Sequence, residues 1–145
     1  MMTRRDAVAA CAVFAELIAS RAADAQGRAT PATPQAAPQP PVFKHDLPNL
    51  TMDDWEVTVN YVDYAPGRVG APHRHAGFVL VYVLEGTVIA QISDQGPERT
   101  YTAGQMFYEQ PGAIHQVSKN ASQTQPARIL AMIFAKKGSV LTTPV

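Results

Sequence analysis

The sequence predicts one all-β domain, built as a sandwich or a small barrel. Short runs of β-branched and aromatic residues recur between turn residues from residue 55 to residue 135, as the strands of such folds do. After residue 50 there is no convincing helical period of apolar residues. A chain of 145 residues is long enough for one domain with a hydrophobic core and too short for two.

Residues 1–25 have the pattern of an export signal. Arg4 and Arg5 precede the mainly apolar stretch AVAACAVFAELIAS, and Ala23-Asp24-Ala25 offers small residues for cleavage after residue 25. The arginine pair resembles a twin-arginine signal, and the alternatives are an ordinary secretory signal or a poorly ordered N-terminal helix. Because the apolar stretch is shorter than the roughly 20 residues of a membrane span, we expect a periplasmic or secreted protein with no stable membrane insertion after cleavage.

Residues 26–50 are predicted to be a disordered linker, and residues 51–145 the folded domain. Pro, Ala, Gln and Thr dominate the first part of the linker. Such a composition buries little apolar surface and favours an extended, mobile chain. His45 stands alone near the end of this segment, where we expect it to be solvated.

Charge and cysteine content exclude several classes of function. Lys plus Arg and Asp plus Glu both total 12, so the net charge is zero. A nucleic-acid partner would need clustered positive charge, which the sequence lacks. Cys11, the only cysteine, lies in the predicted signal. The mature chain would therefore have neither a disulfide nor a cysteine nucleophile.

The predicted strands follow in order along the domain. In residues 55–64, Trp55, Val57, Val59 and Tyr61 alternate with polar residues, which predicts a half-buried strand with these four side chains inward. Residues 79–84 and 87–92 are apolar, β-branched runs that meet at Glu85-Gly86, a pattern typical of a hairpin. Further strands are predicted at residues 99–102, 105–109, 114–118 and 127–135.

Three histidines are spaced as metal ligands on strands. His73 and His75 share one face of an extended chain, because successive strand side chains alternate. His115, on a facing strand, would complete a site of three nitrogen ligands. Imidazole suits Fe, Ni, Mn, Zn or Cu, whereas Ca²⁺ and Mg²⁺ prefer oxygen. The alternative is that His73 and His75 bond only to water or backbone.

Glycines at fixed distances frame these histidines in two segments, G-x5-H-x-H-x10-G and G-x7-G-x2-H. The framing glycines are Gly67, Gly86, Gly104 and Gly112. In these segments the chain resembles the cupin superfamily, whose two motifs are G-x5-H-x-H-x3-4-E-x6-G and G-x5-P-x-G-x2-H-x3-N. The resemblance covers residues 55–134. It implies a jelly-roll, or double-stranded β-helix, barrel that holds a metal inside through His73, His75 and His115.

The chain departs from the two motifs at three positions. The metal-binding glutamate of the first motif falls at Val79, which cannot coordinate a metal. The proline of the second motif falls at Gln110, with Pro111 next to it. The asparagine falls at Lys119, with Asn120 next to it. Only the first departure affects the chemistry of the predicted metal site.

Loss of the glutamate would leave a three-histidine metal with an additional open position for a chelating substrate. Three-histidine cupins include thiol dioxygenases and a β-diketone-cleaving dioxygenase. The resemblance therefore implies a metal-dependent oxygenase that acts on a small apolar, aromatic or dicarbonyl molecule. A non-catalytic cupin that binds or senses a small molecule is the alternative. Relatives often pair through strand edges, so we expect a homodimer.

Glu109 is a candidate catalytic residue, since it is one of two acidic residues close to a motif strand. It would approach the metal, act as a general base or lie in solvent on the outer face, and we expect it to be exposed. The cavity is expected to be largely apolar, with Gln91 placed to orient a ligand. Its predicted wall consists of Tyr61, Phe78, Val79, Gln91, Phe107, Met132 and Phe134.

Overall fold

The computed structural model describes residues 39–145. The predicted export signal and the linker up to residue 38 lie outside the described residues. Residues 39–54 form no helix or strand. The exposed His45 ring packs against the ring of Tyr108, with the centroids 4.2 Å apart and the planes tilted by 38°. No helix in the described part of the chain could span a membrane.

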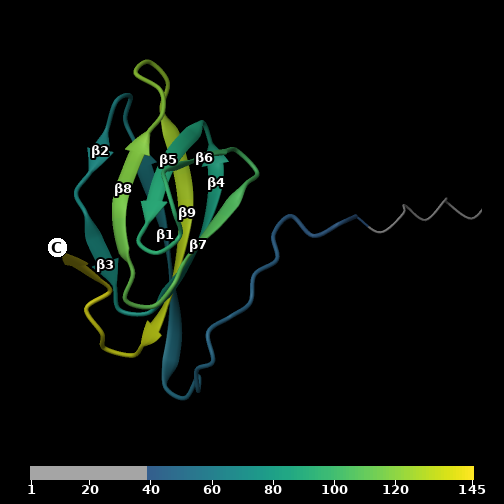
Figure 1. Cartoon of the computed structure of the whole chain (residues 1–145), viewed down its shortest axis with the longest axis vertical. Helices are drawn as coiled ribbons and strands as arrows, with labels where there is room; N and C mark the ends of the chain where they lie inside the picture. Colours follow the sequence, from purple (N-terminus) through teal and green to yellow (C-terminus); the bar gives the residue numbers. More distant parts are fainter. Residues whose placement is uncertain (1–38) are drawn as a thin grey trace, which may run out of the picture. The chain divides into compact units, whose positions relative to one another are not determined.

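Residues 39–145 form ten β-strands in two sheets, which confirms the all-β prediction. The four-stranded sheet has the order β1-β9-β4-β7, and the six-stranded sheet has the order β10-β3-β8-β5-β6, with β2 paired to β8. In Figure 1, β8 and β5 lie in front of β9. The strands are β1 (Trp55–Tyr64), β2 (Val69–Gly70), β3 (His73–His75), β4 (Phe78–Glu85), β5 (Thr87–Ile92), β6 (Arg99–Thr102), β7 (Met106–Glu109), β8 (Ile114–Asn120), β9 (Ala127–Lys136) and β10 (Thr142–Pro144).

The hydrophobic core lies between the two sheets. The four-stranded sheet contributes alternate residues of β4 and β9, including the fully buried Val79 and Val83. The six-stranded sheet contributes Val88, Ala90 and Ile92 from β5. This alternation of buried and less buried side chains is what strands packed on one face produce.

The predicted hairpin at Glu85-Gly86 is wrong. Strand β4 pairs with β7 and β9, whereas β5 pairs with β6 and β8, so the chain passes from one sheet to the other at Gly86. Gly86 has φ +71°, and a Cβ atom there would lie 2.5 Å from the carbonyl oxygen of Pro126. The glycine therefore allows a crossing close to a neighbouring backbone, where any side chain would collide.

The predicted inward face of β1 is also wrong. Val57, Val59 and Tyr61 are 49%, 52% and 71% exposed, whereas Tyr64 near the strand end is buried. Strand β1 is an edge strand paired only with β9 within the described residues. The pattern of alternation was correct, but alternation alone does not state which of the two faces the core covers.

A β-bulge in β8 explains the displaced asparagine of the second motif. Gln91 pairs with Val117 and Ile92 with His115, so Gln116 is an extra residue in β8. The side chain of Asn120, which is 3% exposed, therefore points inward one position after the place of the motif asparagine. Its amide nitrogen donates to the carbonyl oxygens of Tyr64, Ala65 and Gln125 at 3.2, 3.1 and 2.8 Å.

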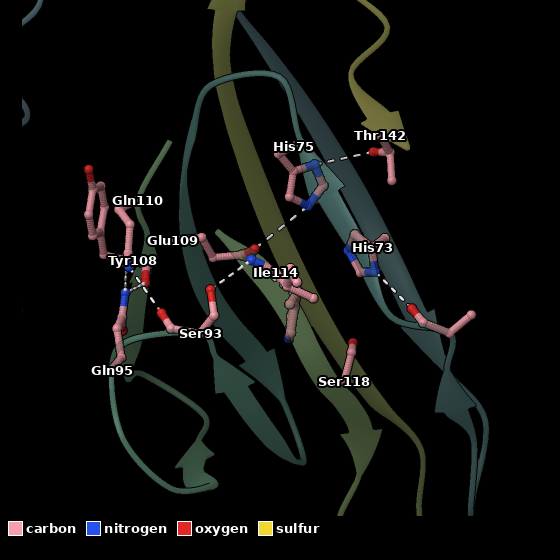
Figure 2. A network of polar contacts seen from close by, with 12 residues as sticks. His73, His75, Ser93, Gln95, Tyr108, Glu109, Gln110, Ile114, Ser118 and Thr142 are labelled. Carbon is pink, nitrogen blue, oxygen red and sulfur yellow. Dashed lines mark hydrogen bonds and ion pairs between the residues drawn. The ribbon is translucent and has the colours of Figure 1, made fainter. Parts of the chain in front are cut away.

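Gln110, at the proline position of the second motif, ties the turn after β7 to the loop after β5. Its amide nitrogen donates to the Ser93 carbonyl at 3.0 Å, and its side-chain oxygen accepts from Gln95. Figure 2 shows these residues together. Side-chain hydrogen bonds thus hold this turn in addition to Pro111.

Candidate metal centre

The three predicted ligands lie together on the six-stranded sheet. His73 of β3 is the direct cross-strand partner of His115 of β8, and His75 lies two residues along β3. The ring centroid of His73 is 4.9 Å from that of His75 and 5.1 Å from that of His115. His115 is thus on the neighbouring strand of the same sheet and not on a facing strand, as the sequence pattern had suggested.

His73 and His75 are both held through Nδ1. His73 Nδ1 donates to the Ala71 carbonyl at 2.9 Å, and His75 Nδ1 donates to the Leu141 carbonyl at 3.1 Å. The Thr142 hydroxyl of β10 lies 3.2 Å from the same His75 nitrogen (Figure 2). A proton on Nδ1 leaves the Nε2 lone pair available, which is the usual arrangement of a metal-bound histidine.

Burial favours the neutral form of the His75 imidazole. Desolvation lowers the pKa of His75, against the opposing effect of the nearby Glu109 carboxylate. The neutral imidazole is the form that coordinates a metal.

His115 has a buried nitrogen without a protein partner. The side chain is 4% exposed, and its Nε2 forms no hydrogen bond in the described structure. A buried polar atom of this kind usually has a partner, and a bound ion is one of the explanations for the exceptions. The Nε2 atom of His115 is therefore a candidate binding atom for a metal.

Glu109 is buried and faces the histidines, which corrects the expectation that it is exposed. It is 4% exposed, and its two carboxylate oxygens lie 3.2 Å from His115 Nδ1 and 3.8 Å from His75 Nε2. Figure 2 shows Glu109 and His75 turned toward each other from opposite sides of the site. The alternation along β7 places it inward, a register that the following Pro111-Gly112 turn concealed in the sequence.

The donor set fits a transition metal, although the side chains are not yet in coordination geometry. Among residues 39–145, no three His, Cys, Asp or Glu side chains converge as the ligands of a closed site do. The imidazoles would have to turn so that their free nitrogens meet. Three imidazoles with a carboxylate nearby are nonetheless the chemistry that Fe, Ni, Mn, Zn or Cu prefers.

A cavity of about 430 Å³ opens beside the histidines, and its wall is mostly apolar. Val79 and Tyr61, both expected in the wall, line it together with His73, His75, His115 and Glu109. The sequence analysis did not select the further apolar wall residues, which come from alternate positions of β4 and β9. They are Val81, Ile129, Ala131 and Ile133.

Five residues expected in the wall lie elsewhere. Phe78, Met132 and Phe134 have the opposite parity to Val79 and Ile133, so they lie on the outer face of their sheet. There Phe78 stacks on Phe134 with ring centroids 4.6 Å apart. The error is a shift of one residue, which moves a strand side chain to the other face.

The other two misplaced residues have different surroundings. Gln91 donates to the Gly96 carbonyl at 3.3 Å, in the loop after β5, and does not reach the cavity. Phe107 faces inward but belongs to the hydrophobic core, where its ring lies 4.7 Å from that of Tyr101.

A polar group at the cavity was missed by the sequence analysis. The hydroxyls of Tyr64 and Ser118 are 2.6 Å apart and buried. Burial raises the pKa of Tyr64, partly offset by the hydrogen bond with Ser118. The guanidinium of Arg68 lies over the Tyr64 ring, 5.0 Å from its centroid, and Arg68 also lines the cavity. The sequence pattern of β8 could not have predicted that Ser118 faces inward, because the bulge at Gln116 shifts the alternation by one residue.

The family model for the cupin domain matches residues 60–133, which contain the histidine strands β3 and β8 and parts of both sheets. The chain belongs to the cupin family. This confirms the resemblance in the two motifs and identifies the sandwich as a cupin fold, of the kind that binds small molecules in many relatives.

Comparison with known proteins places this cupin among diverse relatives. It is 29% identical over 72 residues to the β-alanine degradation protein BauB of Pseudomonas aeruginosa strain PAO1, covering 49% of this chain and 76% of that protein. It also resembles an oxalate oxidase solved with the substrate analogue glycolate, with a TM-score of 0.52 and 21% identity. The match covers 72% of this cupin and 63% of the oxidase.

A second solved structure is similar in fold over a smaller part of its own length. It is the oxalate decarboxylase of Bacillus subtilis, whose Mn(II) centres were studied by mutagenesis. The TM-score is 0.50 with 20% identity, and the match covers 61% of this cupin and 24% of the decarboxylase. At these identities the two solved structures support the fold alone.

Proposed function

We propose that this cupin is a metal-dependent enzyme of the oxygenase type, with His73, His75 and His115 as metal ligands. The observation that carries the proposal is the buried Nε2 of His115, which has no hydrogen-bond partner among residues 39–145 and lies beside two histidines whose Nδ1 atoms are already bonded. A divalent Fe, Ni, Mn, Zn or Cu ion is the proposed cofactor. When bound, it would polarise the oxygen atoms of a chelating substrate.

The cavity favours a small substrate with an apolar body and a carbonyl or anionic end. Its volume of about 430 Å³ suits a small molecule, and its inner wall is formed by side chains such as Val81 and Ile133. Arg68 offers a positive charge, and the Tyr64–Ser118 hydroxyl pair offers polar atoms. An aromatic or dicarbonyl compound meets these requirements better than a sugar, which would leave many hydroxyls against apolar side chains.

Elemental analysis of the purified protein tests the metal site. The wild-type protein is expected to contain a stoichiometric transition metal, and His115→Ala is expected to lose it while His45→Ala keeps it. Oxygen consumption with a panel of diketones, flavonoids and catechols then tests the reaction. Absence of metal from both wild type and His115→Ala would refute the proposal. Tight ligand binding without oxygen uptake would favour a binding or sensing protein instead.

We also propose a homodimer formed through the β1 edge. Val57, Val59 and Tyr61 form an exposed apolar row on this edge strand. Among residues 39–145 its outer backbone groups have no strand partner, so they are able to pair with a second strand. Val59→Lys is expected to give a monomer in sedimentation analysis, whereas Asn60→Lys on the same strand is expected to give a dimer. A monomeric wild-type protein would contradict this arrangement.

Export is proposed from the first 25 residues of the sequence. Fractionation of cells that express the full chain is expected to recover the protein in the periplasm or medium. Substitution of both Arg4 and Arg5 by lysine is expected to retain it in the cytoplasm if the twin-arginine route is used, and to leave export unchanged if an ordinary secretory route is used.

A further inference from the structure

The carboxylate that is missing from the first cupin motif has a counterpart on the adjacent strand. Val79 of β4, at the position of the motif glutamate, is the direct cross-strand partner of Glu109 of β7. Side chains of directly opposed residues in an antiparallel pair project from the same face, about 5 Å apart at Cβ. Glu109 therefore presents a carboxylate beside the place from which the motif glutamate would have projected.

Glu109 is buried without a cationic protein partner. It is 4% exposed, and no Lys or Arg nitrogen of residues 39–145 lies within ion-pair distance of its oxygens. Its close partners are instead two imidazole nitrogens, at 3.2 and 3.8 Å. Burying a carboxylate is costly unless a positive charge or several hydrogen bonds compensate, and a divalent cation held by the same histidines would supply that charge.

We propose that Glu109 is the fourth protein ligand of the metal, so that β7 supplies the carboxylate that the motif takes from β4. The inference rests on the metal site proposed above. It restores a set of three histidines and one carboxylate with one negative charge. The open position expected from the loss of the motif glutamate is then occupied, which leaves one position fewer for substrate.

The contacts of Glu109 favour a ligand over a residue that only orients His115. The approach to His115 Nδ1 is close, yet in the described structure it lacks the direction of a hydrogen bond, since it is found only as an ion-pair contact. The second oxygen approaches His75, on a different strand. The carboxylate thus lies between two imidazoles, whereas an orienting group needs to contact only one. Because it faces Nδ1 of His115, a metal shared with Nε2 of the same ring would require that ring to turn.

A variant that moves the carboxylate from Glu109 to position 79 tests whether Glu109 is a metal ligand. Calorimetry would measure the Mn²⁺ and Zn²⁺ affinities of the wild type, of Glu109→Gln and of the exchange variant Val79→Glu/Glu109→Val. The control is Glu98→Gln, because the Glu98 carboxylate forms an ion pair with Lys119 on the surface. We expect Glu109→Gln to weaken binding about 100-fold or more, as the loss of one of four ligands would, which is beyond the roughly tenfold to 100-fold loss expected for a group that only orients a ligand. The exchange variant should regain most of this loss, and Glu98→Gln should equal wild type.

The electron paramagnetic resonance spectrum of bound Mn²⁺ provides a second measurement that does not depend on the exchange variant. Glu109→Gln keeps the side-chain shape, so it is expected to fold and to show a changed Mn²⁺ spectrum. Equal affinity and an identical spectrum in wild type and Glu109→Gln would overturn the ligand role and leave the three-histidine site intact. Wild-type protein that binds neither ion would instead refute the metal site itself.

Discussion

The two sheets of this cupin contribute to the candidate metal centre in different ways. The six-stranded sheet supplies all three histidines, from the adjacent strands β3 and β8. The four-stranded sheet supplies Glu109 and the apolar wall that includes Val79. The histidines are related by spacing along the chain and by one strand pairing. The Glu109 carboxylate comes close to the histidines only because one sheet packs on the other. The contribution of each sheet to metal binding can therefore be tested with separate variants.

The largest expected effect comes from removing two ligands of the six-stranded sheet. The double variant His73→Ala/His75→Ala is expected to lower metal affinity by about 10⁴-fold to 10⁶-fold. Each ligand of a four-ligand site contributes roughly a quarter of a binding free energy of about 10–16 kcal/mol, so two ligands contribute about 5–8 kcal/mol. Calorimetric titration with Zn²⁺ measures this. A smaller loss than that of Glu109→Gln would reverse the assignment of the main ligands to the six-stranded sheet.

Asn120 tests how the six-stranded sheet is anchored. Asn120→Ala removes three hydrogen bonds to backbone carbonyls and leaves those acceptors without their partner. We expect a loss of about 3 kcal/mol in the free energy of unfolding, measured by urea denaturation. The exposed Asn49 offers a control, and Asn49→Ala should be neutral. An Asn120→Ala protein as stable as wild type would show that the bulge in β8 does not depend on this side chain.

Thr142 tests whether β10 orients a ligand. Thr142→Val removes the hydroxyl beside His75 Nδ1 but keeps the bond to the Leu141 carbonyl. We therefore expect only a loss of about threefold to tenfold in metal affinity, at or below the usual range for groups that orient ligands. Thr143→Val, one residue along the same strand, should bind metal as wild type does. A similar loss in both variants would point to damage to β10 as a whole.

The smallest effect is expected on the outer surface of the six-stranded sheet. Glu98→Gln removes the partly exposed ion pair with Lys119, which spans 2.9 Å. Such pairs contribute about 0.5 kcal/mol, so the melting temperature and the metal affinity should scarcely change. A marked loss of metal in this variant would mean that the loop between β5 and β6 affects the histidines of the same sheet.

Much of the fold and the histidine cluster could be predicted from the sequence. Strand alternation and the glycine spacing around His73, His75 and His115 are local, so they are visible in the chain itself. Other features were not visible. Phe78 and Phe134 were predicted on the wrong face of their strands, because alternation defines two faces without saying which one faces the cavity.

By itself, the sequence determined that this protein is an all-β cupin with three histidines on two strands. Those features follow from residue spacing, which the backbone geometry of a strand converts directly into position. Only the tertiary structure decided that Glu109 is buried beside them, that Val79 is its cross-strand partner and that Asn120 reaches the interior. These depend on strand pairing and on a bulge, and pairing between distant segments is set by how the whole core packs.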